Sequence, residues 1–297
     1  MKIKLGIAPI AWSNDDMPEL GGDTPIETCL KEVKEAGYKG IELGGKFPRN
    51  PGITRYLLSK FDLKMPGGWY GAHLRTRTAK EEWDAMQNHL NLLNLVNGDV
   101  FVFADVSGSI QGIGTKPLSS RPRLEKDEWD SYCKKINELS ARLDDVGIPM
   151  SYHEHMGTII QTEEDINKFM DKTNDKTYLL YDTGHLLFAK ADNERVLKNY
   201  ISRINHIHCK DIRKNILKQS LDQDMSFRDS FLNGIFTVPG DGCIDYMPLI
   251  KVLHEKKYEN WLVIEAEQDP KKANPLQYAK IGNKYLTKIL IDIGYKI

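Results

Sequence analysis

The chain of 297 residues contains few cysteines, and they lie far apart. Its four cysteines form no Cys-x-x-Cys pair, which argues against a zinc ribbon and against a disulfide framework. Free, scattered cysteines are typical of proteins in a reducing compartment. We therefore expect a cytoplasmic location.

Long apolar runs are missing as well. No stretch of about 18 apolar residues occurs, so the sequence predicts no membrane span. Residues 1–7 are basic but lack an apolar run and a cleavage site, and they fit a first strand better than a signal peptide. The net charge is -1, which argues against nucleic acid and anionic membranes as partners.

The sequence also lacks the features that divide a chain or bind a nucleotide. No low-complexity segment and no linker rich in Pro or Ser interrupts it, so we expect one domain over residues 1–297. A Rossmann fingerprint is absent, because the glycines of residues 108–114 have another spacing and lie well after the first strand. There is no P-loop pattern either.

What recurs is a short β-type run followed by a helical pattern. The expected strands are residues 4–11, 39–43, 63–69, 99–104, 148–152, 178–181, 204–209 and 261–264. The expected helices are residues 24–36, 54–60, 81–96, 125–146, 163–172, 193–200, 246–256 and 275–293. Strict alternation predicts an α/β protein with parallel strands. Eight such units favour a single-domain (β/α)8 TIM barrel over an open, doubly wound sheet.

Polar side chains gather where the last four strands end. In parallel α/β folds, ligands bind at the carboxyl ends of the strands. The residues there are His153, Glu154, His155, Asp182, His185, His206, His208, Lys210, Glu265 and Glu267. Imidazole with carboxylate, without a set of thiolates, suits a divalent ion such as Mn²⁺, Co²⁺, Fe²⁺ or Zn²⁺. The sequence therefore predicts a metal centre at one mouth of the barrel.

Alternation of side chains along a strand narrows the choice of ligands. His206 and His208 lie two residues apart, so both point into the mouth. His153 and His155 likewise share one side of their strand, and Glu154 faces the other. If this geometry persists to the strand end, Glu154 lies behind the ligands.

Several further residues are candidates for binding a substrate. Asn14 and Asp15 follow the first strand and either bind hydroxyls or form a solvated Asx turn. Trp69 ends the third strand and is expected to wall a pocket, with His73 close behind it. Arg213 follows the seventh strand and is either a substrate contact or a solvated side chain.

Some of these motifs resemble a known superfamily. Asp-Thr-Gly-His at 182–185, His-x-His-x-Lys-Asp at 206–211, Gly-Asp-Gly-x-Ile-Asp at 240–245 and Ile-Glu-x-Glu at 264–267 resemble the xylose-isomerase-like barrels, which are sugar isomerases, epimerases and dehydratases. More narrowly, residues 6–12, 14–22, 152–158 and 265–270 are similar to the inosose dehydratase family of inositol catabolism. The run Asn-Asp-Asp-Met-Pro-Glu-Leu-Gly-Gly is the most specific of these matches.

The resemblance implies a hydro-lyase that removes water from a cyclitol, 2-keto-myo-inositol (scyllo-inosose), to give a trihydroxycyclohexane-dione. It also implies a divalent cation, Co²⁺ or Mn²⁺, and a requirement for glutathione. In the superfamily the metal lies between ligands from strands five to eight, and Asp182, His208 and Glu265 match the last three. Where the superfamily has a strand-five Glu, this chain has His153. Either His153 is the remaining ligand, or a shifted strand lets Glu154 take that place.

Loss of water beside a ketone needs a base, a positive charge for the enolate and an acid for the departing hydroxide. His185, three residues after Asp182, is placed to contact a substrate hydroxyl. Lys210 has a second interpretation, as a structural ion pair with Asp211. The sequence does not rank the candidates for the base and the acid, which are Glu154, His155, Lys210 and Glu267.

Three other functions share part of this pattern. A sugar isomerase or epimerase would use the same barrel and metal but only move a proton. An endonuclease acting at abasic sites would need more than one metal and a basic face. A non-catalytic sugar-binding barrel would need no metal. Residues 107–125 and 214–240 are expected to be long loops that either cover the mouth or contact the partner subunit of a homo-oligomer.

Overall fold

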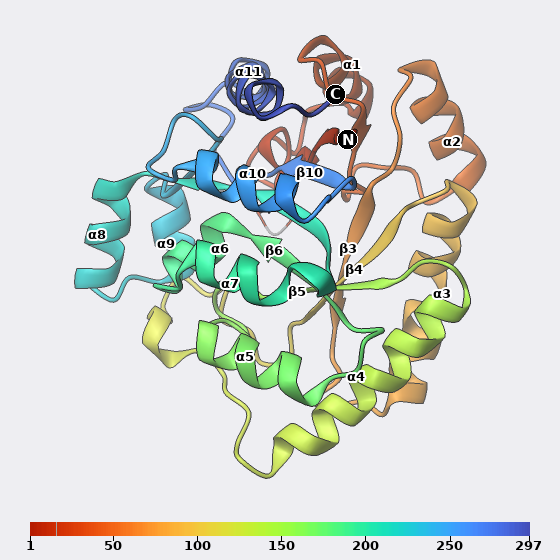
Figure 1. The fold of residues 1–297 in the computed structure, drawn as a ribbon, viewed down its shortest axis with the longest axis vertical. Coiled ribbons are helices and arrows are strands. Elements are labelled where there is room, and N and C mark those ends of the chain that lie inside the picture. Colours follow the sequence, from red (N-terminus) through yellow and green to blue (C-terminus); the bar gives the residue numbers. More distant parts are fainter. Residues whose placement is uncertain (16) are drawn as a thin grey trace.

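The computed structural model describes residues 1–15 and 17–297, and its centre is a parallel sheet (Figure 1). Eight strands follow the order β2-β1-β10-β7-β6-β5-β4-β3, and each pairs with its neighbours in parallel. The strands are β1 (Lys4–Ile7), β2 (Gly40–Ile41), β3 (Gly67–Ala72), β4 (Val100–Asp105), β5 (Met150–His153), β6 (Tyr178–Asp182), β7 (Ile204–Cys209) and β10 (Trp261–Ile264).

Contacts between β2 and β3 join the two ends of this sheet. Parallel bridges link Gly40 with Lys64 and Leu43 with Gly68. The amide of Leu43 donates to the carbonyl of Gly67 over 2.9 Å. Because an open sheet leaves its edge strands apart, this closure confirms the predicted barrel and excludes the doubly wound alternative.

Helices surround the strands on the outside (Figure 1). They are α1 (Ile26–Glu35), α2 (Pro51–Lys60), α3 (Ala79–Leu95), α4 (Glu128–Asp145), α5 (Glu163–Lys172), α6 (Thr183–Phe188), α7 (Asn193–Tyr200), α10 (Tyr246–Glu255) and α11 (Pro275–Ile293), with 3-10 turns at Pro9–Ala11, Leu118–Ser120 and Ile201–Arg203. Capping boxes at Thr78 and Thr162 fix the starts of α3 and α5. In the described part of the chain, no helix is long and apolar enough to cross a membrane.

Several expectations about elements were wrong. The first strand ends at Ile7 instead of residue 11, because residues 9–11 form a 3-10 turn, and α6 directly follows β6 where no helix was expected. The third strand begins at Gly67 instead of residue 63, because Pro66 has no amide hydrogen for a ladder and only an isolated bridge forms before it, at Lys64. The segment 214–240 is not a plain loop. It contains α8 (Lys214–Asp222) and α9 (Phe227–Leu232), flanked by the antiparallel pair β8 (Asp211–Ile212) and β9 (Phe236–Thr237).

A second apolar cluster forms from the segments that follow the strands. It packs α9 and β9 against residues after β1, β4, β5 and β6, and consists of Met17, Leu118, Met156, Phe188, Ile212, Phe227, Phe231, Ile235 and Phe236. The rings of Phe227 and Phe236 lie 6.0 and 5.3 Å from the ring of His185. The segment 211–237 therefore covers part of the mouth with apolar side chains.

Candidate metal centre

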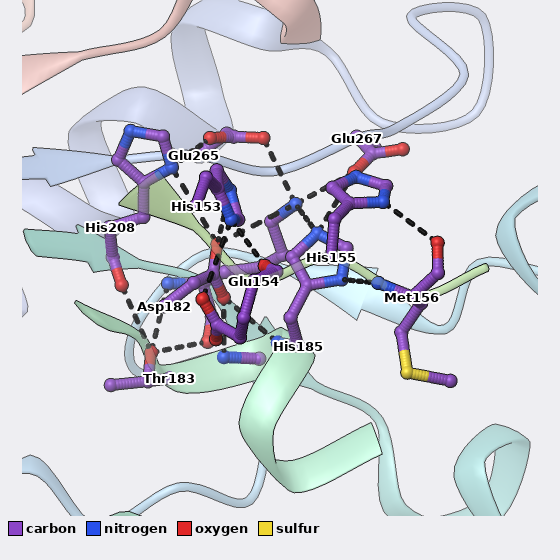
Figure 2. Close-up of polar contacts among 12 residues, drawn as sticks. His153, Glu154, His155, Met156, Asp182, Thr183, His185, His208, Glu265 and Glu267 are labelled. Atoms are coloured by element: carbon purple, nitrogen blue, oxygen red, sulfur yellow. Dashed lines mark hydrogen bonds and ion pairs between the residues drawn. The ribbon is translucent and has the colours of Figure 1, made fainter. Parts of the chain in front are cut away.

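Four side chains from four neighbouring strands meet at the carboxyl end of the barrel (Figure 2). One donor atom of each lies within 4.8 Å of the others, and all four residues are buried. They are His153 on β5, Asp182 on β6, His208 on β7 and Glu265 directly after β10. The structure thus brings together the four residues that the sequence indicated as metal ligands.

The register of the strands explains this meeting. Asp182 pairs with His208 across β6 and β7, and His208 pairs with Val263 across β7 and β10. Glu265 lies two residues after Val263, and side chains two residues apart share a face. His153 pairs with Leu180, which is two residues before Asp182. All four side chains therefore point to one side of the sheet.

Unpaired buried atoms mark the centre of this cluster. His208 Nδ1 lies 2.5 Å from Glu265 Oε2 and 3.6 Å from Asp182 Oδ2, and His153 Nε2 lies 3.7 Å from that same oxygen. Apart from these ion-pair contacts, neither His208 Nδ1 nor Asp182 Oδ2 has a hydrogen-bond partner among the described residues. Buried polar atoms without partners are costly. Two imidazoles and two carboxylates converging in this way fit a divalent cation.

His153 and Glu154 have opposite electrostatic surroundings. Burial, followed by the charge of His208, lowers the pKa of His153 well below its usual value, so its imidazole is neutral, as a ligand must be. Burial, followed by the charge of Asp182, raises the pKa of Glu154 well above the usual range. Glu154 is fully buried and does not line the cavity described below, so it does not reach substrate there.

Glu42, directly after β2, supports the cluster, although strand alternation assigned it no role. Its Oε1 accepts hydrogen bonds from His206 Nε2 over 2.7 Å and from His208 Nε2 over 3.1 Å. Burial would raise the pKa of Glu42, but the charge of His208 and these two hydrogen bonds lower it to about 2. Burial would lower the pKa of His208, but the charges of Glu42 and Glu265 raise it well above its usual value. Because the bond to Glu42 fixes a proton on Nε2, Nδ1 is the nitrogen that would give up its proton to a metal.

We expect Glu42→Gln to weaken divalent-metal binding about 10–100-fold, because an amide no longer fixes the orientation and tautomer of His208. Titration with Mn²⁺, followed by the electron paramagnetic resonance of the free ion, measures the affinity. Glu35→Gln, which alters an exposed pair with Lys280, is the matched control. Equal affinity in Glu42→Gln and the control would contradict this role of Glu42.

The remaining catalytic candidates form a second cluster beside the first. His155, His185 and Glu267 each place a donor atom within 4.8 Å of the other two, and all are buried. Lys210 Nζ lies 2.7 Å from Glu267 Oε1 and 3.0 Å from His185 Nε2. Figure 2 shows His155, His185 and Glu267 grouped beside the metal cluster.

The alternative that Lys210 pairs with Asp211 was wrong. Lys210 lies between the end of β7 and the start of β8, and its Nζ contacts Glu265, Glu267 and His185. Asp211 Oδ1 instead accepts the backbone amides of Ile212 over 2.7 Å and Ile244 over 2.9 Å. Asp211 therefore holds the loop before α10, and Lys210 belongs to the site.

A cavity opens beside both clusters. Its empty volume is ≈ 680 Å³, counting the open solvent at its mouth. Its lining consists of Ala8, Pro9, Ile10, Asp15, Glu42, Leu43, Gly44, Trp69, Val102, Gln111, His155, His208, Glu265 and Glu267. Trp69 is 36% exposed, and its ring lies edge-on to His153 and His155 at 5.5 and 5.4 Å. The lining thus combines apolar side chains with acidic and imidazole groups.

The two described residues of the motif after β1, Asn14 and Asp15, have different surroundings. Asp15 is exposed and lines the cavity, and its Oδ2 accepts the backbone amide of Gly45 over 2.7 Å. Asn14 is buried, and its Oδ1 accepts the amide of Met17 over 2.9 Å, as in the turn that was the alternative. Asn14 lines an adjacent hollow that also contains Asp15 and Trp69. Asp16 of this motif lies outside the described residues.

The structure places His73 and Arg213 outside the lining of this cavity. His73 is exposed where the chain turns toward α3. Arg213 lies beyond the barrel in the segment between β7 and α10, where it donates to the carbonyls of Gly234 over 2.8 Å and Phe236 over 3.1 Å. Both positions depend on the course of loops, which strand alternation does not predict. Gln111, which lines the cavity, was missed for the same reason.

The chain is similar to a protein family, to curated relatives in sequence and to solved structures in fold. The family model described as xylose isomerase-like TIM barrel matches residues 30–289. The chain is 42% identical to the rhizopine catabolism protein MocC of Rhizobium meliloti, over 100% of this chain and 91% of that protein. It is also 42% identical to the inosose dehydratase of Clostridium tetani, over 96% of both chains. A probable 3-DHS dehydratase, AsbF of Bacillus anthracis, has a similar fold, with a TM-score of 0.72 at 14% identity over 97% of this chain and 99% of that one.

Proposed function

Since this chain belongs to the xylose isomerase-like TIM barrel family, we propose that it is an inosose dehydratase, a hydro-lyase that removes water from scyllo-inosose in inositol catabolism. The observation that carries this proposal is the cluster of His153, Asp182, His208 and Glu265, of which His208 and Glu265 line a cavity. Relatives that are named inosose dehydratase, at 42% identity over nearly the full chain, favour loss of water over isomerisation.

The four clustered residues would hold a divalent cation, and we propose Mn²⁺ or Co²⁺ because both accept imidazole and carboxylate ligands. Such a cation supplies a Lewis acid that stabilises the enolate oxygen formed when the ketone loses its α-proton. Glu42 would keep His208 in the tautomer that binds metal.

We assign proton transfer to residues that line the cavity. Among the described candidates for base and acid, His155 and Glu267 line it, whereas Glu154 and Lys210 are buried away from it. His155 Nδ1 contacts the carbonyl of Met156 over 2.8 Å, which leaves the lone pair on Nε2. Burial, followed by the charge of Lys210, lowers the pKa of His155 to about 3, so this imidazole is neutral near pH 7.

We therefore assign the proton steps to His155 and the binding of a ring hydroxyl to Glu267. The neutral imidazole takes the α-proton of the ketone, and the imidazolium that forms returns it to the departing hydroxide, which leaves as water. Trp69, edge-on to His155, offers an apolar wall to the ring of the cyclitol.

Incubation with scyllo-inosose tests the proposal. We expect absorbance from the conjugated dione to grow in the metal-loaded protein, to stop after treatment with a chelator and to return with Mn²⁺ or Co²⁺. The expected loss on chelation is at least about 10²-fold, since a catalytic charge is removed. Full turnover in the chelator would contradict the metal centre. Conversion to an isomeric ketose without loss of water would replace the dehydratase with an isomerase.

Three further features are proposed together with this function. A glutathione requirement is implied by the resemblance described above and is tested by assaying turnover with and without the thiol. A cytoplasmic location is supported by the four cysteines, which are all free thiols. A homo-oligomer stays a prediction, which sedimentation of the purified protein would test.

A further inference from the structure

We infer that the ammonium of Lys210 is a fixed cation that fills a second cluster of metal-type donors, so that the site holds one divalent ion and not two. The inference rests on the metal centre proposed above. It starts from the second buried donor cluster, His155, His185 and Glu267, whose ligand atoms lie as close together as those of the first. By donor chemistry alone, this cluster could hold another cation.

The ammonium group of Lys210 lies among these donors. Its Nζ lies 2.7 Å from Glu267 Oε1, 3.0 Å from Glu265 Oε1 and 3.0 Å from His185 Nε2. A protonated lysine has three N–H donors, and two carboxylate oxygens receive two of them. The side chain is fully buried, so these contacts replace its water shell.

Glu265 joins the two clusters through its two oxygens. Its Oε2 lies 2.5 Å from His208 Nδ1, at the first cluster, and its Oε1 lies 3.0 Å from Lys210 Nζ. In enzymes with two metals the ions lie about 3.5–4 Å apart and share one site. Lys210 Nζ therefore contacts one oxygen of Glu265 in the place where a second metal ion would bind it.

Contacts with neighbouring residues hold Lys210 in this place. The hydroxyl of Thr183 donates to the carbonyl of Lys210 over 2.8 Å. A Cβ added at Gly184 would come within 2.7 Å of Lys210 Cγ, so the absence of a side chain there makes room for the lysine stem. The ring of Phe236 lies 4.6 Å from Nζ and covers the ammonium.

The motif Asp-Thr-Gly-His at 182–185 thereby gains a role at each position. Asp182 belongs to the metal cluster, Thr183 and Gly184 hold the backbone and stem of Lys210, and His185 Nε2 lies 3.0 Å from its Nζ. A second divalent ion could enter only by displacing a buried ammonium that is hydrogen-bonded to two carboxylates. Repulsion between the two cations opposes its entry while Lys210 is present.

Counting bound Mn²⁺ in the full-length protein tests the inference. We expect the wild type to saturate at one equivalent, without the exchange-coupled resonance signal of two neighbouring ions. Lys210→Ala removes the ammonium and opens the space, so we expect the count to rise to two equivalents with a coupled signal. Lys214→Ala, at an exposed lysine that begins α8, is the matched control and should keep one equivalent.

A coupled pair of Mn²⁺ ions in the wild type would overturn the inference, and so would a single equivalent in folded Lys210→Ala. If circular dichroism shows that Lys210→Ala does not fold, Lys210→Gln, which retains an N–H donor for one carboxylate, takes its place with the same expectation. Metal counting needs no substrate. Metal counting can therefore contradict this inference without contradicting the proposed dehydratase activity. That activity is tested separately, by the turnover of the wild type.

Discussion

Asp182→Asn is expected to abolish loss of water from scyllo-inosose and to release the divalent ion while the barrel stays folded. Asp182 Oδ2 faces the metal cluster without a hydrogen-bond partner in the described chain, whereas Oδ1 accepts the amides of Gly184 over 2.8 Å and His185 over 2.9 Å. Asparagine keeps an oxygen for the two amides at the start of α6 and loses the charge that a cation requires. We expect turnover to fall by at least about 10³-fold.

Asp192 offers a matched control for this experiment. It also caps a helix, because its Oδ1 accepts the amide of Arg195 at the start of α7, but it is exposed and lies outside the metal cluster. Asp192→Ala should cost about 1 kcal/mol of stability through the lost cap and leave turnover unchanged. Glu265→Ala should behave like Asp182→Asn. Wild-type turnover and metal content in Asp182→Asn or in Glu265→Ala would refute the assignment of the metal centre.

The barrel and its metal cluster could be predicted from the sequence because both depend on short-range patterns. Alternating strands and helices predict a parallel sheet, and parallel strands place their carboxyl ends at one mouth. The side-chain period of two along a strand assigns His208 and Glu265 to the inner face. His153 joins this cluster for the same reason.

Residues that depend on contacts across the barrel or on loops could not be found in this way. Glu42 reaches His208 although β2 and β7 are not neighbours in the sheet, so strand pairing gives no signal for it. The placing of Lys210 depends on the gap at Gly184, and that of Arg213 on two short strands beyond the barrel. Such contacts are fixed by tertiary packing, which a single sequence does not display.

His153→Ala and Glu154→Gln should separate the two alternatives for the ligand on strand five. We expect His153→Ala to weaken Mn²⁺ binding by at least about 10²-fold, because a ligand is removed. Glu154→Gln should leave the affinity within about threefold, because burial keeps this carboxyl protonated and glutamine has nearly the same shape. Titration of both variants with Mn²⁺ measures the difference.

The contacts of His153 explain why the effects should differ. His153 Nδ1 contacts the backbone carbonyl of Glu154, and this contact places the proton on Nδ1 and leaves Nε2 facing Asp182. If Glu154→Gln instead lost the metal as fully as Asp182→Asn while His153→Ala kept it, the strand would have to be shifted by one residue on metal binding. That result would exchange the two roles, since a shift of one residue turns every side chain of a strand to its other face.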